Sequence, residues 1–252
     1  MAGRKSRRMP WPARLTLALV GLFLLYQAWM LGQVLWYAYF NPGSSAVMRE
    51  EMAVLRKADP RIALQYTWVP YDRISNSLKR AVIASEDANF LDNNGVEWDA
   101  IRDAWTYNQR QEELGRRARR GGSTITQQLA KNLLLSNSRN YLRKGEELLV
   151  TFMIDRIMSK RRILELYLNI AEWGTGVFGA QAAARHYYQV DASRLGAYQA
   201  AKLASMLPNP RYYDRHRDTR YLEGRAGIIA ERMRQVDIPG SGPAGNPVQS
   251  EK

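Results

Sequence analysis

Residues 121–132, GGSTITQQLAKN, bring together side chains that are suited to holding an anion. A helix turns about 100° per residue, so a helix that begins near Ser123 carries four polar side chains on one stripe. These residues are Thr124, Gln127, Gln128 and Lys131. Hydroxyl, amide and ammonium groups on one face can donate hydrogen bonds and positive charge to a phosphate or a carboxylate. The same stripe could also be an ordinary solvated face of a helix.

Gly121 and Gly122 set this stretch apart from an ordinary polar helix. Paired glycines destabilise a helix, so they indicate a flexible hinge or a close approach of the backbone to another group. The preceding residues 109–120, QRQEELGRRARR, are highly charged and predict a mobile loop. A hinge and a loop beside the polar stripe favour a functional site.

Two other clusters of charged residues, each with a carboxylate, could act with these residues. Glu86 and Asp87 follow the apolar run AVIA, so they lie where a helix leaves the core. An adjacent acidic pair is more often a solvated helix end than a catalytic pair. Arg143 and Glu147 are four residues apart, which by itself predicts a surface ion pair worth about 0.3–0.5 kcal/mol.

The composition excludes several kinds of chemistry. The chain has 252 residues and no cysteine, which rules out disulfides, thiolate metal sites and cysteine nucleophiles. His186 and His216 are the only histidines, too few for a histidine-rich metal cage. The formal net charge of +13 suggests nucleic acid as a partner, but no motif for reading nucleic acid occurs. Five of the cations instead precede an apolar segment: Arg4, Lys5, Arg7, Arg8 and Arg14.

That apolar segment, residues 15–40, contains 26 residues without a charge, and a bilayer needs about 20. The basic segment 1–14 before it predicts a cytoplasmic N-terminus and an external domain after the span. Aromatic residues at its outer half resemble an interfacial belt: Trp29, Trp36, Tyr37 and Tyr39. A cleaved signal peptide is the alternative, with SSA at residues 44–46 as the cleavage site. Signal peptides have apolar cores of about 7–15 residues, so a retained anchor is favoured.

Helical periodicity dominates the rest of the chain. We expect a juxtamembrane connector over residues 41–70, a folded domain over 71–238 and a disordered Gly/Pro-rich tail over 239–252. No run of alternating β-branched residues predicts a sheet. Glu165 is expected to pair with Arg161 on its own helix. The expected fold class is therefore mostly α, with a single N-terminal transmembrane helix.

The motifs in their order along the chain resemble those of the peptidoglycan glycosyltransferases. The matching segments are ED..F....G, GGSTITQQLAKN, RKxxE, K..ILELYLN and G....G..AAA..YY. The similarity runs from about Trp68 to Tyr213, and twelve consecutive motif residues at 121–132 make it very specific. With one N-terminal anchor and no downstream penicillin-binding module, the layout is similar to that of the monofunctional biosynthetic peptidoglycan transglycosylases. The resemblance implies a lysozyme-like, two-lobed helical domain with a membrane-facing jaw beside the catalytic cleft.

The resemblance also implies a reaction and its residues. Lipid II units are polymerised with inversion at the anomeric carbon, and polyprenyl pyrophosphate leaves. By correspondence, Glu86 is the general base, and Glu147 is a second carboxylate near the pyrophosphate. The substrate-binding residues are then Thr124, Gln128, Lys131, Asn132 and Arg143. The supporting residues are Asp87, Phe90, Ser123 and Gln127.

The chemistry of the reaction is consistent with this assignment of a base and of substrate-binding residues. An attacking hydroxyl needs a base, whereas a departing pyrophosphate needs cations and hydrogen-bond donors rather than a proton. Carboxylates that face phosphates often share Mg²⁺ or Mn²⁺, but no residue identifies a metal here. The family's first motif usually has histidine where this chain has Asn93. Asparagine keeps a hydrogen bond but carries no proton at neutral pH, which bears on turnover more than on reaction type.

Two other functions remain open. A lysozyme-like lytic enzyme needs a protonated carboxylic acid and has no use for Lys131 and Arg143 on a phosphate. A non-catalytic cell-wall assembly scaffold would not need the pair Glu86 and Glu147. The expected partners are lipid II, the growing lipid-linked glycan, the membrane and other cell-wall synthesis and division proteins, and no nucleic acid. The expected location is the bacterial inner membrane, with a periplasmic catalytic domain.

Overall fold

A computed structural model describes residues 10–116, 120–136 and 141–240 of the chain. The predicted basic segment 1–14 and tail 239–252 lie largely outside the described residues. Within the tail, Pro239 is described, and its carbonyl accepts a hydrogen bond of 2.9 Å from the Tyr71 hydroxyl.

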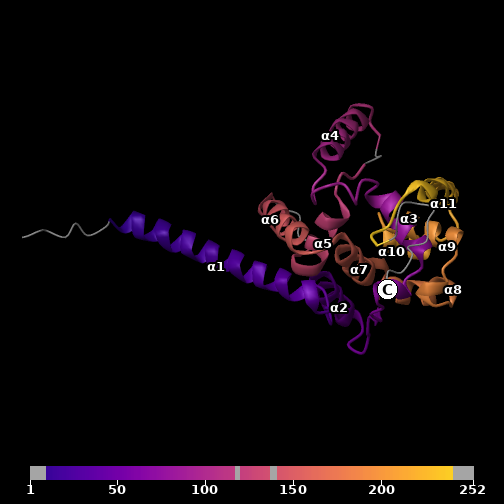
Figure 1. The fold of residues 1–252 in the computed structure, drawn as a ribbon, viewed down its shortest axis with the longest axis horizontal. Helices are drawn as coiled ribbons and strands as arrows, with labels where there is room; N and C mark the ends of the chain where they lie inside the picture. The colour runs from indigo at the N-terminus through magenta and orange to yellow at the C-terminus, as the bar shows by residue number, and fades with distance from the viewer. Residues whose placement is uncertain (1–9, 117–119, 137–140, 241–252) are drawn as a thin grey trace, which may run out of the picture.

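The described chain is mostly α-helical, as the sequence predicts (Figure 1). The helices are α1 (Trp11–Tyr39), α2 (Ala46–Ala58), α3 (Asn76–Glu86), α4 (Trp98–Glu113), α5 (Ile125–Leu134), α6 (Tyr141–Ile157), α7 (Lys160–Ile170), α8 (Ala180–Tyr188), α9 (Ala197–Met206), α10 (Pro210–Arg215) and α11 (Arg220–Arg232). Short 3₁₀ turns lie at Tyr71–Arg73, Ala192–Arg194 and Met233–Gln235.

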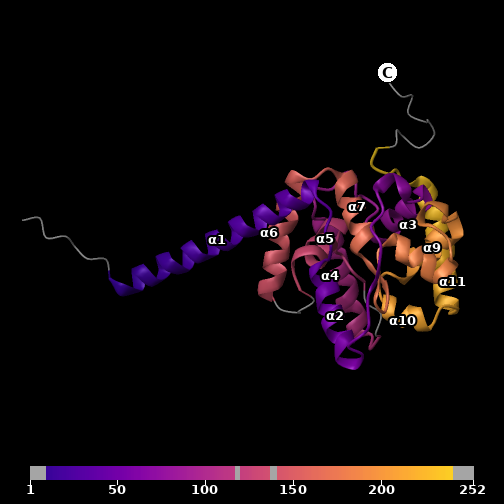
Figure 2. The same ribbon diagram turned by 90° about the horizontal axis from the view of Figure 1, so that it is seen from below.

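The helices form two groups around α7, as Figures 1 and 2 show. In one group α5 packs against α2, α6 and α7, and in the other α3 packs against α9 and α11. Apolar side chains of both groups belong to one core, which includes Leu78, Leu129 and Ile163. A common core therefore holds the C-terminal end of α3 and the whole of α5. These two elements carry several of the predicted site residues.

The sequence analysis missed a small sheet. Strands β1 (Gln65–Tyr66), β2 (Glu172–Gly174) and β3 (Val177–Phe178) lie in the order β1-β3-β2, with β1 parallel and β2 antiparallel to β3. Strands of two or three residues are too short to show an alternating pattern, so periodicity could not reveal them.

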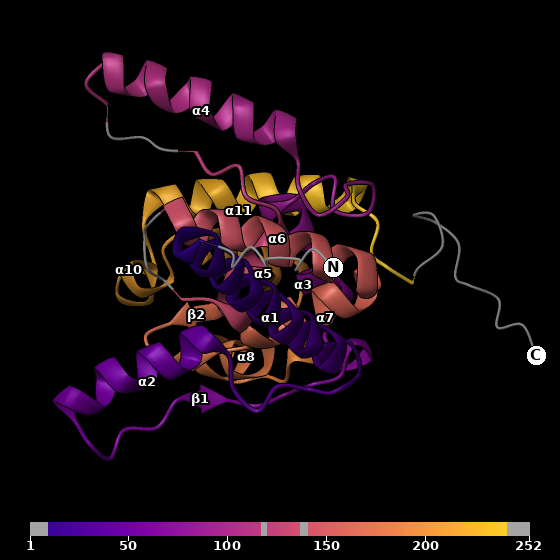
Figure 3. The same ribbon diagram turned by 90° about the vertical axis from the view of Figure 1, so that its left-hand side faces the viewer.

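Helix α1 leaves the body of the domain at one end and packs against α6 at the other (Figures 1 and 2). It is long and apolar enough to cross a membrane by length and composition. Figure 3, which looks toward the N-terminal side, shows α4 on one side of α1 and α2 on the other.

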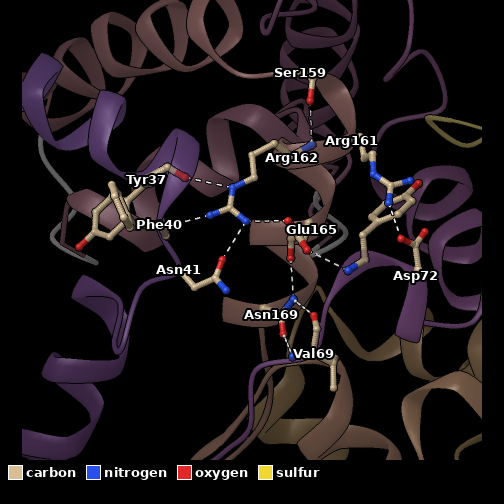
Figure 4. Close-up of polar contacts among 11 residues, drawn as sticks. Tyr37, Phe40, Asn41, Val69, Asp72, Ser159, Arg161, Arg162, Glu165 and Asn169 are labelled. Carbon is tan, nitrogen blue, oxygen red and sulfur yellow. Dashed lines mark hydrogen bonds and ion pairs between the residues drawn. The ribbon is translucent and has the colours of Figure 1, made fainter.

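Arg162 of α7 binds the C-terminal end of α1 (Figure 4). Its guanidinium donates to the carbonyl oxygens of Tyr37 at 3.0 Å and Phe40 at 2.9 Å, and to Asn41 Oδ1 at 2.9 Å. The last carbonyls of a helix have no partner within the helix, and a cation there also favours the helix dipole. Arg162 therefore ties the long apolar helix to the helical domain.

The predicted pairing of Glu165 with Arg161 is wrong. Arg162, three residues before Glu165, donates to its Oε2 at 2.6 Å, and Glu165 Oε1 accepts from the backbone N–H of Tyr71 at 2.8 Å. Arg161 instead pairs with Asp72 at 2.6 Å. The spacing permits either arginine, and the neighbouring segments decide which one turns toward Glu165.

The glycine pair marks a close approach of two backbones. A Cβ added at Gly122 would lie 2.7 Å from the carbonyl oxygen of Ala100 in α4, whereas one added at Gly121 meets no described atom within 4 Å. Helix α4 extends to Glu113, so the prediction of a mobile loop over residues 109–120 is wrong for its first five residues. Of the remaining residues of that loop, 117–119 lie outside the described chain.

This contact predicts different responses to alanine at the two glycines. Gly122→Ala should destabilise the protein by about 1–3 kcal/mol, because the new methyl group overlaps backbone atoms that cannot rotate away. Gly121→Ala is the matched control and should melt like the wild type. Thermal melting of the detergent-solubilised proteins tests this, and equal melting temperatures for both variants would contradict the close approach.

Candidate active site

Glu86 is the last residue of α3, where the helix leaves the core as the sequence predicts. The Ser75 side chain caps the start of this helix by accepting from the Leu78 N–H at 3.1 Å. Leu78, Val82 and Ile83 are fully buried and hold the helix in place. The buried face of α3 therefore fixes the position of Glu86 at the end of the helix.

Both carboxylate oxygens of Glu86 accept hydrogen bonds. Gln128 Nε2 of α5 donates to Oε2 at 2.9 Å, and the Ser85 hydroxyl donates to Oε1 at 3.2 Å. Burial raises the pKa of Glu86, while the Gln128 hydrogen bond, the Arg225 charge and the Ser85 hydrogen bond oppose this rise. Its proton affinity is thus set by a balance between burial on one side and two hydrogen bonds and one positive charge on the other.

Asp87 joins three segments. Its Oδ2 accepts from the backbone N–H of Ile125, the first residue of α5, at 3.0 Å, and its Oδ1 accepts from Asn93 Nδ2 at 2.8 Å. A carboxylate at a helix N-terminus satisfies a free N–H and favours the helix dipole. Burial raises the pKa of Asp87 to about 6, although these hydrogen bonds oppose the rise.

Asn93 lies at the position where the family usually has histidine. Its hydrogen bonds hold the loop before α4 in place. Besides donating to Asp87, it accepts from the Gly95 N–H at 3.0 Å through Oδ1. Lys160 Nζ donates to its backbone carbonyl at 2.6 Å. The amide therefore acts through hydrogen bonds alone, and no proton transfer is needed for this role.

Helix α5 begins at Ile125 rather than near Ser123, and its first turn is internal to the protein. Thr124 is the N-cap: it accepts from the Gln127 N–H at 3.1 Å and donates to the Gly95 carbonyl at 2.5 Å. Gln127 completes a capping box by accepting from the Thr124 N–H at 3.0 Å. Thr124 and Gln127 are buried, so the predicted polar stripe divides into a buried cap and a second part formed by Gln128 and Lys131.

Lys131 lies half-buried in the last turn of α5, near a carboxylate that the sequence analysis missed. Burial raises the pKa of Glu172 in β2, while Arg211 and Lys131 oppose the rise. Arg211 also links Glu172, at 2.7 Å, to the buried Glu51 of α2, at 2.6 Å. The positive charge of Lys131 therefore acts on Glu172, which Arg211 binds directly.

Glu147 of α6 is a buried carboxylate, and not the acid of a surface ion pair. Its side chain is 4% exposed, and Arg143 Nη1 binds its Oε2 at 2.6 Å. Lys144 also donates to Oε1 of Glu147. A buried carboxylate with two cations holds those cations in fixed positions, where a bound phosphate can share them.

Three other predicted residues have simpler surroundings. Phe90 is fully buried in the core, with Lys160 Nζ 5.2 Å from its ring centroid. Ser123 and Asn132 are half-buried, the first just before α5 and the second beside Lys131 in the same helix.

The structure adds side chains around Glu86 that the sequence analysis did not single out. Tyr167 donates from its hydroxyl to Gln128 Oε1 at 3.0 Å, and Arg225 Nη2 donates to the Ser85 hydroxyl at 3.3 Å. Tyr167 lies inside the quoted motif ILELYLN, so the motif contained a signal for it. Arg225 lies in a periodic helix beyond the matched motifs, and only the fold brings it near.

A cavity of about 650 Å³ lies between α1, α2, the end of α5 and the start of α6. Its walls combine apolar and charged side chains, including Tyr26, Arg49, Leu134, Leu142, Arg143 and Glu146. Arg143 therefore borders both Glu147 and a cavity that reaches the long apolar helix.

The donor set does not form a metal site by itself. Among the described residues, no cluster of three or more His, Asp or Glu side chains is placed to hold a metal ion. The carboxylate of Glu147 is already engaged by Arg143 and Lys144. Side-chain cations can supply the positive charge that a phosphate needs.

Comparisons with known proteins identify the family of the chain. A model of the transglycosylase family matches residues 44–234. A biosynthetic peptidoglycan transglycosylase of Bordetella pertussis is 65% identical over 237 residues, covering 93% of this chain and 98% of the relative. Proteins of the same name from Laribacter hongkongensis and Janthinobacterium sp. are 53% and 52% identical, over 92% and 86% of this chain and 100% and 93% of their own lengths.

The buried Asp87 predicts a pH-dependent contribution to stability. Its folded-state pKa of about 6 exceeds the ordinary 3.8, so its contribution is complete below about pH 4 and is lost as pH rises through 6. Two pKa units correspond to on the order of 3 kcal/mol. Asp87→Asn should therefore gain stability relative to the wild type between pH 4 and 7, by several degrees in melting temperature.

The control is Asp103→Asn, which changes an exposed carboxylate of α4. Its melting temperature should follow the wild type at every pH. A constant difference between wild type and Asp87→Asn across this range would refute the raised pKa.

Proposed function

Because the chain belongs to the biosynthetic peptidoglycan transglycosylase family, we propose that it polymerises lipid II into glycan strands and releases polyprenyl pyrophosphate. It is a glycosyltransferase that acts on peptidoglycan. The observation that carries the detailed proposal is the position of Gln128 and Lys131 on one short helix, with Gln128 bonded to Glu86.

Glu86 is the proposed general base. The 4-hydroxyl of the acceptor sugar attacks the anomeric carbon of the growing chain, and a carboxylate at this point takes its proton. The donors on both oxygens of Glu86 support its ionised form against the cost of burial. Inversion at the anomeric carbon follows from attack opposite the leaving group.

Lys131 and Arg143 are the proposed partners of the departing pyrophosphate. No proton donor is required, because the leaving group is already a stable anion; it requires fixed positive charge. Glu147 holds Arg143 in place, and guanidinium geometry suits phosphate oxygens. Thr124, first predicted to bind substrate, is proposed only to cap α5, because its hydroxyl is engaged by Gly95 and Gln127.

A lytic enzyme would use Glu86 as an acid, and its raised pKa alone would suit that role. The hydrogen bonds donated to both oxygens favour the carboxylate instead, and the relatives are named for biosynthesis. Synthesis is therefore the favoured reaction.

The base assignment predicts that Glu86→Gln will fold and melt at least as high as the wild type, because burial disfavours the ionised carboxylate, but will form no glycan chains from purified lipid II. We expect a loss of at least 10²-fold, typical of removing a general base. The control is Glu231→Gln, an exposed carboxylate of α11. Product length is read by gel electrophoresis. Near-normal polymer from Glu86→Gln would rule out the role, whereas shortened glycan from a sacculus with wild-type protein would indicate a lytic enzyme.

We further propose that α1 anchors the protein in the bacterial inner membrane, with a cytoplasmic N-terminus and a periplasmic domain. The outer boundary of the apolar core is proposed near Gln27 rather than at Phe40. Gln27 bonds Glu146 of α6 at 3.0 Å, and a carboxylate is costly deep in a bilayer. About 20 residues cross the core, so a span that ends near Met30 begins near Trp11, and Arg14 lies in its first turn, where its side chain can reach the cytoplasmic headgroups.

This depth predicts the reactivity of single cysteines, and the chain has none of its own. Leu25 and Leu35 are both exposed on α1, at 70% and 46%. In proteoliposomes with the domain outside, Leu35→Cys should react with a membrane-impermeant maleimide and Leu25→Cys should not. Protection of both cysteines would place the boundary near Phe40, and labelling of both would argue against an anchor.

A further inference from the structure

Gln128 makes two side-chain hydrogen bonds, one at each end of its amide. Its Nε2 donates to Glu86 Oε2 at 2.9 Å, and its Oε1 accepts from the Tyr167 hydroxyl at 3.0 Å. The three side chains come from α3, α5 and α7, so the chain of hydrogen bonds crosses three helices.

An amide can present either its oxygen or its nitrogen to a neighbour. An ionised carboxylate only accepts, so it attracts the nitrogen and repels the oxygen. Tyr167 reinforces that choice from the opposite end, because a phenol that donates to Oε1 leaves Nε2 to face Glu86. Without the phenol hydroxyl, only the carboxylate would orient the amide.

We propose that Tyr167 is a positioning residue, which fixes the amide of Gln128 so that the carboxylate of Glu86 keeps one donor on Oε2. This inference rests on the proposed role of Glu86 as general base. Tyr167 acts on Glu86 through Gln128 and does not touch the substrate.

The surroundings of Tyr167 suit this task. The residue is 1% exposed and lies in α7, which packs directly against α5. Burial raises the pKa of Tyr167 well above its ordinary value, with the negative charges of Glu86 and Asp87 adding to the rise. The phenol therefore keeps its proton at every working pH and remains a donor.

The consequence for catalysis is a shift in pH dependence. The hydrogen bond from Gln128 lowers the pKa of Glu86 against the effect of burial. When this bond is weakened, the carboxylate binds its proton more tightly, and a larger part of the enzyme is inactive in mild acid. The acidic limb of the rate profile must then move to higher pH.

The test is Tyr167→Phe, which removes one oxygen atom and keeps the ring. We expect the rate of lipid II polymerisation to fall several-fold on the acidic limb of the pH profile and to recover as the pH rises, because the bond from Gln128 to the carboxylate is weakened rather than removed. The matched control is Tyr187→Phe in α8, whose hydroxyl donates to the Trp173 carbonyl at 2.7 Å and to Asp214 at 3.0 Å. The control should keep the wild-type pH profile even if it melts at a lower temperature.

A double variant separates positioning from simple loss of stability. Adding Tyr167→Phe to Gln128→Ala should lower the remaining rate no further and should leave its pH profile unchanged. An unshifted profile for Tyr167→Phe alone, or full additivity with Gln128→Ala, would overturn the inference. Failure of the proposed function looks different, because the wild-type protein would then form no polymer at any pH.

Discussion

The carboxylate of Asp87 is the constraint on which the geometry of the site depends. It accepts from the first N–H of α5 and from Asn93, while its own backbone ends α3. The start of one helix and the end of another are thereby fixed to each other across 38 residues of sequence. Together with the common core, this junction sets the distance between the helices that carry Glu86 and Gln128.

Much of the fold could be predicted from the sequence, together with the helices that carry the proposed site residues. Periodicity gave the helices that carry Glu86, Lys131 and Arg143, because each has an apolar face toward the core. The motif order indicated the family, and the family model and relatives confirm it. The contact of Arg143 with Glu147 followed from their spacing of four residues.

Properties that depend on packing could not be predicted in the same way. The polar stripe of α5 was expected to present four side chains together, yet Thr124 and Gln127 close the helix end and are buried. Periodicity places residues on a face but does not say which neighbour covers that face. The positions of Arg225 and Glu172 depend on contacts between segments that are distant in the sequence. The choice of Arg162 over Arg161 does too, because Asp72 engages Arg161.

Helix α5 places three of the predicted site contacts at fixed intervals along its length. Its first N–H binds Asp87, Gln128 in its second turn binds Glu86, and Lys131 follows one turn later. Three residues of helix advance about 4.5 Å, so the amide that binds Glu86 and the ammonium of Lys131 lie on successive turns of one helix. The capping box of Thr124 and Gln127 keeps the first turn of α5 from fraying. This turn leads directly to Gln128, so the cap helps to hold Gln128 against Glu86.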